Sequence, residues 1–187
     1  MTTVELGGLL RGMVETYPNL QPAVVDIDIE FNELLVLGDE SLLTQCFGDL
    51  LDNAAKFVAP GVRPHIRVWA ESVQRPKSKV QSQGAEASAV GHAARGTEHE
   101  STLNPVVRVW LEDNGIGIEK PYHGKIWEMF QQLDTSSEGT GIGLALVRKV
   151  VERMQGEVGV ESEVGHGSRF WVELKPWRGS EGQGPST

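Results

Sequence analysis

The chain has 187 residues, a hydrophobic fraction of 39% and a formal net charge of −9. This length suits one domain with a sizeable core. The acidic balance argues against a nucleic-acid groove and against contact with an anionic membrane surface, because both need a basic face. No apolar run approaches the ~20 residues that span a bilayer, and the lone cysteine, Cys46, has no disulfide partner. These features suit a cytoplasmic protein.

The first half of the chain predicts two helices and two short strands. Residues 4–16 carry apolar side chains at helical spacing, and residues 22–28 and 33–37 have the pattern of strands. Asp39 is a good N-cap for a long helix that runs to about Phe57. The apolar stripe of this helix, which we expect in the core, is Leu43, Phe47, Leu50, Ala54 and Phe57.

The middle of the chain predicts a hairpin with a long insertion. Strands at 65–73 and 106–113 flank residues 74–104, which are rich in Ser, Gln, Gly and Ala and contain no aromatic residue. Such a composition cannot bury enough surface to order itself, so we expect a flexible insertion. Residues 119–138 are irregular apart from a short helix around 126–130.

The last third predicts one helix and a strand pair. The helix runs from about 141 to 154, with Gly156 as its C-terminal stop, and strands follow at 157–162 and 168–175. Residues 177–187 are expected to form a flexible tail. Residues 1–176 are therefore expected to form a single domain.

Three polar residues form a stripe on the helix that begins after Asp39. Asp49, Asn53 and Lys56 stand at i, i+4 and i+7. Such a stripe is usually the solvated face of a helix. Here, however, an amide or carboxylate oxygen suits a hard cation, and an ammonium group one turn on suits phosphate oxygens.

The strand at 106–113 ends in a carboxylate that faces the core. Asp113 shares a face with Val109 and Leu111, so it points toward the expected helix layer, where a carboxylate is costly unless a partner satisfies it. The exocyclic amine of adenine would satisfy it and would favour adenine over guanine. The plainer interpretation is an aspartate that caps an Asp-Asn-Gly turn. Ser168 begins a strand of the same parity and would lie beneath the same base.

Two Gly-x-Gly motifs complete the pattern. Backbone N–H groups of such loops can meet phosphates at a helix N-terminus. Their glycines are Gly115 and Gly117 in the first motif, and Gly139, Gly141 and Gly143 in the second. Each motif is weak evidence alone, and the P-loop, dinucleotide and protein-kinase signatures are absent. Together with the polar residues, the motifs predict an ATP-binding protein.

Five segments, in this order, resemble the motifs of sensor histidine kinases. They are 49–57 (the N box), 113–118 (the first glycine box), 126–130 (the phenylalanine box), 139–145 (the second glycine box) and 165–170 (the strand pair after it). The resemblance spans most of residues 4–175. It implies an α+β fold of the GHKL or Bergerat type, a two-layer α/β sandwich whose mixed, mostly antiparallel sheet is covered by helices on one face.

The resemblance also implies how ATP and Mg²⁺ are held. Asp113 would bind the adenine amine with support from Ser168 through water, Asn53 would coordinate Mg²⁺, and Lys56 would touch phosphate. A mobile lid is implied at about 119–140. The other residues assigned to ATP are Gly115, Gly117 and Ile118 around the base, Phe130 as anchor of the lid, and Gly139, Thr140, Gly141, Gly143 and Leu144 at the lid hinge and phosphates.

Asp49 departs from the family pattern, because sensor kinases more often carry asparagine there. Relatives that hydrolyse ATP place a glutamate at this position as general base. Asp49 would therefore assist the metal or orient a water molecule, although its short side chain disfavours efficient hydrolysis.

The implied reaction is transfer of the ATP γ-phosphoryl group to a protein histidine in a two-component phosphorelay. Sensor kinases carry that histidine on a helical hairpin before the ATP domain, and none of the five histidines here sits in such a setting. The acceptor is expected on a separate dimerisation domain, of the same or another chain, with a response regulator downstream. The isolated domain is expected to be a monomer without nucleic-acid or direct membrane contact.

Two other functions stay open at this point. A stand-alone serine-phosphorylating switch kinase of the anti-sigma type shares the fold, although residues 139–175 are more similar to sensor kinases. A non-catalytic module that binds ATP and gates an interaction would also keep these motifs without an acceptor. A chaperone or topoisomerase ATPase would need a transducer domain, for which the chain lacks room.

One repeated pattern is not explained by ATP binding. Arg-x-Trp-x-Glu occurs on three predicted strands, at 67–71, 108–112 and 169–173. By parity these side chains point away from the helix layer. Cross-strand pairing, with Arg stacked on Trp and paired to Glu, is the more ordinary account. A docking face for a neighbouring domain is the alternative.

Overall fold

The computed structural model describes residues 1–31, 33–76, 103–130 and 141–178. Among these residues, no helix has the length and apolarity to cross a bilayer. In chain order the elements are β1 (Thr2–Glu5), α1 (Leu6–Thr16), the 3-10 helix η1 (Pro18–Leu20), β2 (Asp26–Glu30), β3 (Leu35–Gly38), α2 (Glu40–Lys56), β4 (His65–Pro76), β5 (Leu103–Asp113), the 3-10 helices η3 (Lys120–Tyr122) and η4 (Lys125–Trp127), α3 (Gly143–Arg153), β6 (Glu157–Ser162) and β7 (Ser168–Leu174).

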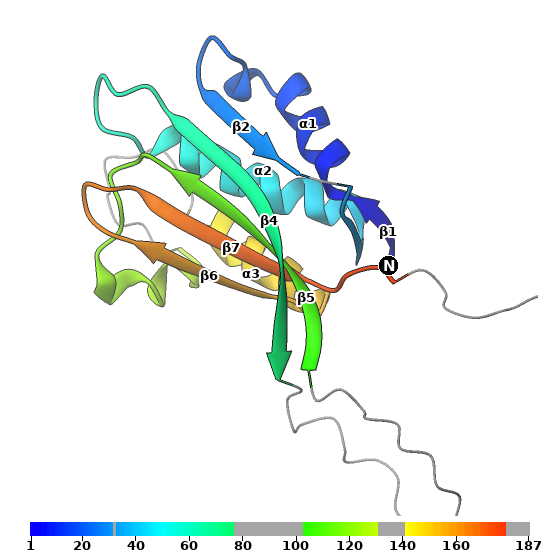
Figure 1. Cartoon of the computed structure of the whole chain (residues 1–187). Coiled ribbons are helices and arrows are strands. Elements are labelled where there is room, and N and C mark those ends of the chain that lie inside the picture. Colours follow the sequence, from blue (N-terminus) through cyan, green and yellow to red (C-terminus); the bar gives the residue numbers. More distant parts are fainter. Residues whose placement is uncertain (32, 77–102, 131–140, 179–187) are drawn as a thin grey trace, which may run out of the picture.

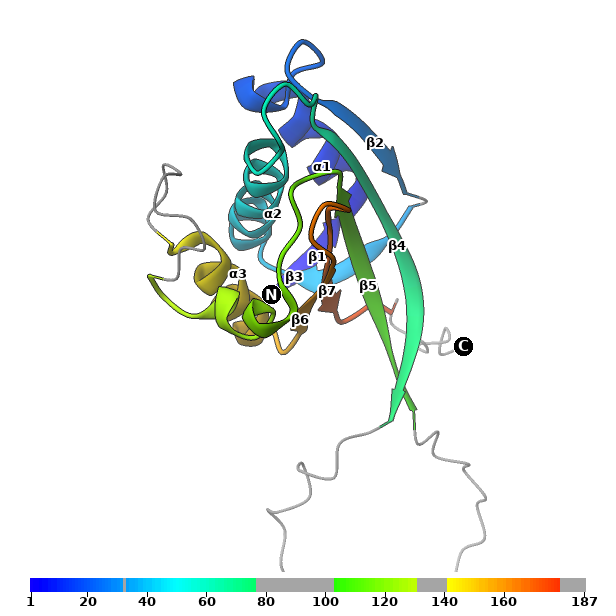
Figure 2. The ribbon, with the colours of Figure 1, turned by 90° about the vertical axis from the view of Figure 1, so that its left-hand side faces the viewer.

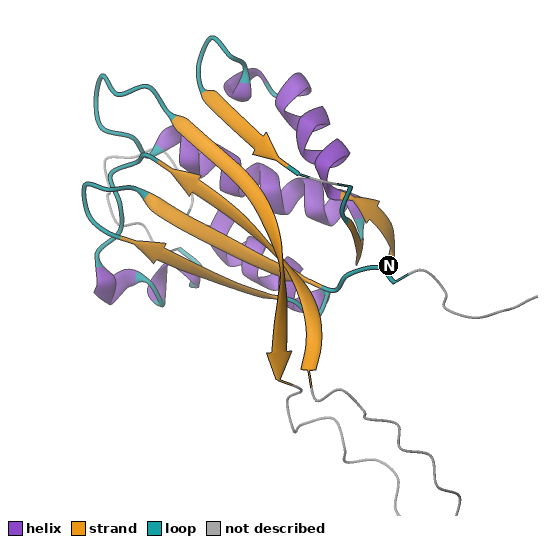
Figure 3. Cartoon of the chain, viewed as in Figure 1, coloured by secondary structure: helices purple, strands orange, loops and turns teal. Residues whose placement is uncertain are grey.

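Five strands form one mixed sheet in the order β2-β4-β5-β7-β6. Only β2 and β4 are parallel, and the other neighbours are antiparallel. Helices α1, α2 and α3 lie on one face of this sheet (Figures 1 and 3), and the turned view in Figure 2 shows the two layers from the side. The predicted two-layer α+β fold is therefore confirmed. A small antiparallel sheet of β1 and β3 was not predicted.

Helix α2 fills the space between the sheet and the other helices. Its predicted N-cap is confirmed, because Asp39 Oδ1 accepts a hydrogen bond from Leu42 N at 3.1 Å. Leu43, Phe47, Leu50 and Ala54 are buried as expected. The core position predicted for Phe57 is wrong: its side chain is 37% exposed, because the helix ends at Lys56 and Phe57 turns away as the C-cap residue.

The first helix begins later than its apolar spacing predicts. Val4 belongs to β1 and is buried opposite Val36. The Glu5 carboxylate then accepts hydrogen bonds from the backbone N–H groups of Gly7 and Gly8, which fixes the start of α1 at the next residue. The strand predicted at 22–28 also lies further along, as β2.

The β4–β5 hairpin is longer than its alternation predicts. Its register runs from Ile66 opposite Asp113 to Pro76 opposite Leu103. Strand β4 therefore ends at Pro76 and not at residue 73, and β5 begins at Leu103 and not at residue 106. The two strands project together beyond the rest of the sheet (Figure 2). Of the predicted insertion, residues 77–102 lie outside the described residues.

The short helix predicted around 126–130 is present but shorter than expected. It is the 3-10 helix η4, which ends at Trp127, because Glu128 is extended and Phe130 has φ +65°. Ile126 and Trp127 are buried, and the Trp127 ring packs edge-on against Phe170 with centroids 6.0 Å apart. The buried aromatic side chain of this stretch is therefore Trp127.

The end of α3 differs in one detail from its prediction. Gln155, with φ +59°, is the left-handed residue that ends the helix. The glycine that follows is required by space, because a Cβ on Gly156 would lie 2.1 Å from the carbonyl oxygen of Glu173. Beyond β7, Trp177 N donates to Leu35 O at 3.0 Å. The predicted domain boundary at 176 stays a prediction, since residues 179–187 are not described.

The Arg-x-Trp-x-Glu strands pair as the ordinary account predicts. Trp69, Trp110 and Trp171 stand in one register row, and the first two rings stack with centroids 6.0 Å apart. Arg108 lies over both Trp110 and Trp171, at 5.4 and 4.9 Å from their ring centroids. Arg67 covers Trp69 in the same way, at 5.0 Å. The guanidinium groups thus cover the tryptophans of the open sheet face.

A carboxylate is buried within this open face. Glu173 is 2% exposed and accepts hydrogen bonds from Arg108 at 2.8 and 2.6 Å. Arg75, near the projecting end of β4, pairs with its second carboxylate oxygen. Two outer pairs are more exposed, Arg67–Glu30 and Arg169–Glu112. The arginines and glutamates of this face are therefore paired across the strands, although Glu173 Oε2 has an ion pair and no hydrogen bond within the described residues.

Candidate nucleotide-binding site

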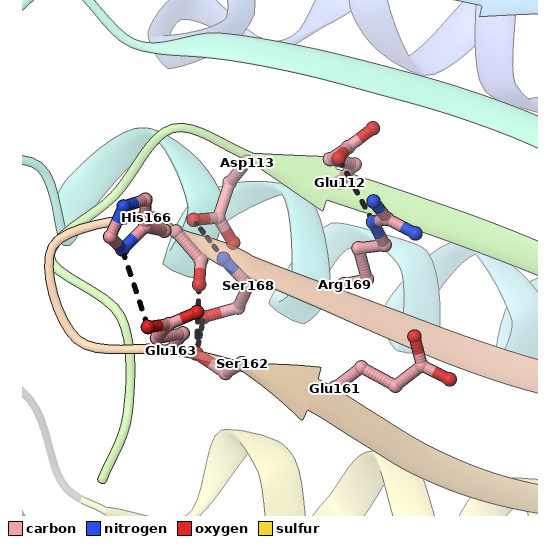
Figure 4. A pocket seen from close by; sticks show the side chains of 9 residues that line it. Glu112, Asp113, Glu161, Ser162, Glu163, His166, Ser168 and Arg169 are labelled. Carbon is pink, nitrogen blue, oxygen red and sulfur yellow. Dashed lines mark hydrogen bonds and ion pairs between the residues drawn. The ribbon is translucent and has the colours of Figure 1, made fainter.

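Asp113 lies at the last position of β5, directly opposite Ser168, the first residue of β7. Its side chain is 9% exposed. The Oδ1 atom accepts a hydrogen bond from the backbone N–H of Ser168 at 3.1 Å (Figure 4). It also accepts one from the backbone N–H of Gly115 at 2.8 Å. Within the described residues Oδ2 accepts none, so one carboxylate oxygen is left for a ligand.

Burial raises the pKa of Asp113 to about 6. The two backbone hydrogen bonds from Gly115 and Ser168 act in the opposite direction, and Glu112 adds a small further rise. Burial therefore outweighs the local hydrogen bonds. A ligand that donates a hydrogen bond to this carboxylate would relieve part of that cost.

The first glycine motif fits a close crossing of three loops. Gly117 has φ +74°, and a Cβ there would lie 2.0 Å from Glu163 O. A Cβ on Gly115 would lie 2.4 Å from the carbonyl oxygen of Phe57. The loop between them is held on both sides, since Ile116 N donates to Phe57 O at 2.9 Å and Gly165 N donates to Ile116 O at 2.8 Å. Larger residues than glycine would push these loops apart.

Two polar residues that the sequence did not single out hold this region together. Asn114 Oδ1 accepts from His65 N at 2.9 Å, and its Nδ2 donates to Arg63 O at 3.0 Å, so it ties the turn after β5 to the start of β4. Ser162 Oγ accepts from Ile118 N at 2.8 Å. The polar contact of Ser162 depends on a residue far away in the sequence, so no local pattern could reveal it.

A hollow of about 330 Å³ opens beside Asp113 and Ser168, at the ends of β5, β6 and β7 (Figure 4). Its remaining lining residues are Glu112, Glu161, Ser162, Glu163, His166, Gly167 and Arg169. Three glutamates would repel a triphosphate. This hollow therefore does not suit the phosphates, whose candidate residues lie on α2 and near the start of α3.

The polar stripe of α2 faces the start of α3. Asp49 and Asn53 are half-buried, whereas Lys56 is exposed, with Nζ 5.3 Å from the centroid of the Phe57 ring. A Cβ on Gly143 would lie 3.6 Å from Asp49 Cγ, so the first residue of α3 packs directly against this carboxylate. The structure thus brings together residues that are far apart in the chain.

Asp49 carries a polar atom without a partner. Its Oδ2 is buried and accepts no hydrogen bond within the described part of the chain. Burial, with a smaller contribution from Asp52, raises the pKa of Asp49 to about 6. Asp52 itself is exposed, as expected for a residue outside the polar stripe. Its Oδ1 accepts a hydrogen bond from Asn19 Nδ2 at 2.8 Å.

The donor set of α2 fits Mg²⁺. A carboxylate oxygen and an amide oxygen one turn apart are hard ligands of the kind that Mg²⁺ prefers. Among the described residues, no group of three His, Cys, Asp or Glu side chains could hold a metal by itself. The ion would therefore depend on phosphate oxygens as further ligands, which is the usual mode for Mg²⁺ with nucleotides.

The residues on either side of the undescribed segment 131–140 are joined. Phe130 N donates to Gly141 O at 2.9 Å. The Phe130 ring is 71% exposed, so the backbone and not the ring makes the contact seen here. Leu144 is half-buried against the core. Gly139 and Thr140, two of the residues assigned to the phosphates, lie outside the described residues.

A one-sided mixed sheet with a buried aspartate at a strand end is typical of ATPases with the Bergerat fold. Residues 38–178 match the family model of histidine kinase-, DNA gyrase B- and HSP90-like ATPases. The chain belongs to this family. Within it, the chain is similar to the ATP-binding catalytic domains of two-component sensor histidine kinases, as the following relatives indicate.

Two proteins similar in sequence to this chain are sensor histidine kinases. The sensor histidine kinase GacS of Pseudomonas protegens is 30% identical over 145 residues, which cover 75% of this chain and 13% of GacS. The sensor histidine kinase AruS of Pseudomonas aeruginosa is 34% identical over 142 residues, which cover 74% of this chain and 11% of AruS. The chain thus spans roughly an eighth of the length of these relatives.

Solved structures of sensor kinases have the same fold. The solved chain of the mycobacterial sensor histidine kinase MprB superposes with a TM-score of 0.64 at 21% identity, over 94% of this chain and 99% of that solved chain. Full-length ShkA in complex with AMPPNP superposes with a TM-score of 0.63 at 27% identity, over 94% of this chain and 31% of ShkA. The predicted family and fold are confirmed.

Proposed function

We propose that this chain binds MgATP and transfers its γ-phosphoryl group to a histidine on a separate helical-hairpin domain. The observation that carries the proposal is the buried carboxylate of Asp113, whose Oδ1 is occupied while its Oδ2 accepts no hydrogen bond from the residues that the structure describes. The adenine amine is such a donor. The structure of ShkA with AMPPNP, an ATP analogue, supports this ligand class.

The phosphates would lie between α2 and the start of α3. Helix α3 has no side-chain N-cap and no acidic residue in its first turn, so its first N–H groups suit an anion. Lys56 would reach a phosphate from α2, and the glycines before α3 would meet the others. Ile118, Phe130 and Leu144 would border the nucleotide.

Asn53 and Asp49 would hold Mg²⁺ together with phosphate oxygens. The ion would neutralise charge on the phosphates when bound. The chain itself supplies orientation: it fixes the base at Asp113 and the phosphates near α3, which leaves the γ-phosphoryl group exposed to a nucleophile. Such positioning and charge neutralisation dominate phosphoryl transfer.

The nucleophile would come from another domain. The dimerising hairpin of a sensor kinase and its downstream response regulator are the partners that this function implies. Because ATP is a cytoplasmic substrate, we place the reaction in the cytoplasm, as part of a larger sensor. We expect the isolated domain to be a monomer.

A mixing experiment tests this proposal. The chain is incubated with γ-labelled ATP and Mg²⁺, alone and with hairpin domains from GacS, AruS and their relatives. We expect label on a hairpin histidine that is lost in acid, and no label on this chain alone. Acid-stable label would indicate a serine kinase instead. Tight ATP binding without transfer to any hairpin would indicate a non-catalytic module.

The variant Asp113→Asn tests the contact between Asp113 and the adenine amine. The substitution keeps the shape of the side chain but replaces the acceptor Oδ2 by a donor. We expect the affinity for ATP to fall by about 10- to 100-fold, because this is the change that loss of a hydrogen bond to a charged group produces. Calorimetry with ATP measures it, and an unchanged affinity would refute the role of Asp113.

A further inference from the structure

Ser162 holds three hydrogen bonds at the end of the sheet where Asp113 lies. In the strand register Ser162 is opposite Ser168, which is opposite Asp113, so the three side chains form a row across β6, β7 and β5 (Figure 4). Ser162 Oγ lies 2.8 Å from Ile118 N, 2.8 Å from the carbonyl oxygen of Gly167 and 2.9 Å from Ser168 Oγ.

The single proton of the Ser162 hydroxyl decides the direction of these bonds. A backbone N–H only donates and a carbonyl oxygen only accepts. Ser162 must therefore donate to Gly167, because otherwise two oxygen lone pairs would face each other at 2.8 Å. Its hydroxyl is then an acceptor in the other two contacts. Consequently the proton shared with Ser168 belongs to Ser168.

This direction leaves Ser168 with only lone pairs for the pocket. Ser168 is 6% exposed and its backbone N–H is bonded to Asp113 Oδ1. The free Asp113 Oδ2 is also an acceptor while the carboxylate is ionised. The polar edge beside the base therefore consists of acceptors alone.

We infer that Ser162 is a positioning residue that makes this site select a 6-amino purine over a 6-oxo purine. The inference rests on the proposed function, with adenine at Asp113. An exocyclic amine donates to both acceptors, whereas a 6-oxo group would place its own lone pairs against those of Asp113 and Ser168. A site built for one pattern rejects the other because its buried polar groups are left unpaired.

A bridging water would not carry this selection. A water that donates one hydrogen to Ser168 can still donate its second hydrogen to N1 of adenine, or accept from the N1–H of hypoxanthine with a lone pair. The selection by Ser162 therefore requires a direct contact between the Ser168 hydroxyl and the group at position 6 of the base.

The test compares ATP with ITP, which differs from it in the 6-amino group. In Ser162→Ala the Ser168 hydroxyl is free to rotate and to donate to the 6-oxo group. We expect the ratio of ATP to ITP affinity, measured by calorimetry, to fall by about tenfold. Ser162→Thr keeps a hydroxyl and should restore the wild-type ratio. If Ser162→Ala does not fold, Ser162→Cys replaces it, since a thiol is a poor acceptor.

Controls separate base selection from general damage. Loss of the bond to Ile118 loosens a loop and should weaken both nucleotides by the same factor. Ser168→Ala removes the rotating hydroxyl, so Ser162→Ala should no longer change the ATP to ITP ratio in that background. An unchanged ratio in Ser162→Ala would overturn the inference alone. Failure of the wild type to bind ATP would overturn the proposed function, and this inference with it.

Discussion

Asp113 keeps its carboxylate in a buried position where the described protein donors are the backbone N–H groups of Gly115 and Ser168. Its pKa rises from 3.8 to about 6 in the folded chain. Between these two values the folded state binds more protons than the unfolded state, so stability falls as pH rises through this window. Near neutral pH the ionised side chain therefore destabilises the nucleotide-free domain.

We predict that Asp113→Asn stabilises the nucleotide-free domain. Near pH 7 the free energy of unfolding should increase by on the order of 2 kcal/mol, because the neutral amide avoids the burial of charge. The gain should shrink as pH falls toward about 4, where the aspartate is itself protonated. Urea denaturation at both pH values measures it. Asp52→Asn, at an exposed site, should have little effect, and a destabilised Asp113→Asn at both pH values would contradict the prediction.

At the scale of elements, β4, β5 and β7 are tied together by the buried Glu173. Its carboxylate is shared by Arg75 and Arg108, whose side chains are 29% and 24% exposed. Removing the carboxylate leaves the partly buried Arg108 guanidinium without its counterion, whereas Arg75 keeps only its ion pair with the exposed Glu157. The Arg169–Glu112 pair joins β7 and β5 in the same way, but its side chains are 52% and 36% exposed.

We predict that Glu173→Gln destabilises the domain more than its matched control, Glu112→Gln. The loss of unfolding free energy should be about 2 kcal/mol for Glu173, reduced from the value for fully buried pairs by the exposure of its partners. For Glu112 it should stay below about 1 kcal/mol. Urea denaturation of both variants measures the difference. Equal losses would show that burial of Glu173 has no energetic consequence.

Elements whose limits depend on local residues can be predicted from the sequence, whereas elements that depend on distant strand partners cannot. The limits of α2 follow from a local cap at Asp39 and a local apolar period, so they could be predicted. The parity that buries Asp113 is also local. The extension of β4 to Pro76 and the strand at Thr2–Glu5 depend on partners far away in the sequence, which local patterns do not contain.

The same distinction applies to the candidate site. Asp113, Asn53 and the glycines carry residue types that point to their chemistry. Ser162 has a common residue type, and its contacts to Ile118 and Ser168 arise only when β6 meets β7 and the loop after β5. The sequence shows that Asp49 departs from the family pattern, but only the structure shows that its buried Oδ2 has no partner within the described part of the chain.

In the whole molecule, the helix-covered face and the open face of the sheet differ in the residues that they carry. The proposed phosphate and metal residues lie on α2 and α3, on the helix-covered face (Figure 2). On the open face the tryptophans are covered by arginines and the charges are paired. A surface that already satisfies its own charges and covers its aromatic rings offers little to a partner.

We therefore predict that the tryptophan row stabilises the domain and does not dock the phosphoacceptor. The Trp171 ring lies over Gly159, where a Cβ would approach it within 2.2 Å, so Trp171→Ala removes buried contacts and should cost about 3 kcal/mol of unfolding free energy. Trp69→Ala, nearer the β2 edge, should cost less unfolding free energy.

The same variants test docking. At a temperature where both variants are folded, ATP affinity and the rate of phosphoryl transfer to the hairpin should stay within about twofold of wild type. A fall in transfer by about tenfold or more, with ATP affinity unchanged, would instead show that the partner docks on the open face.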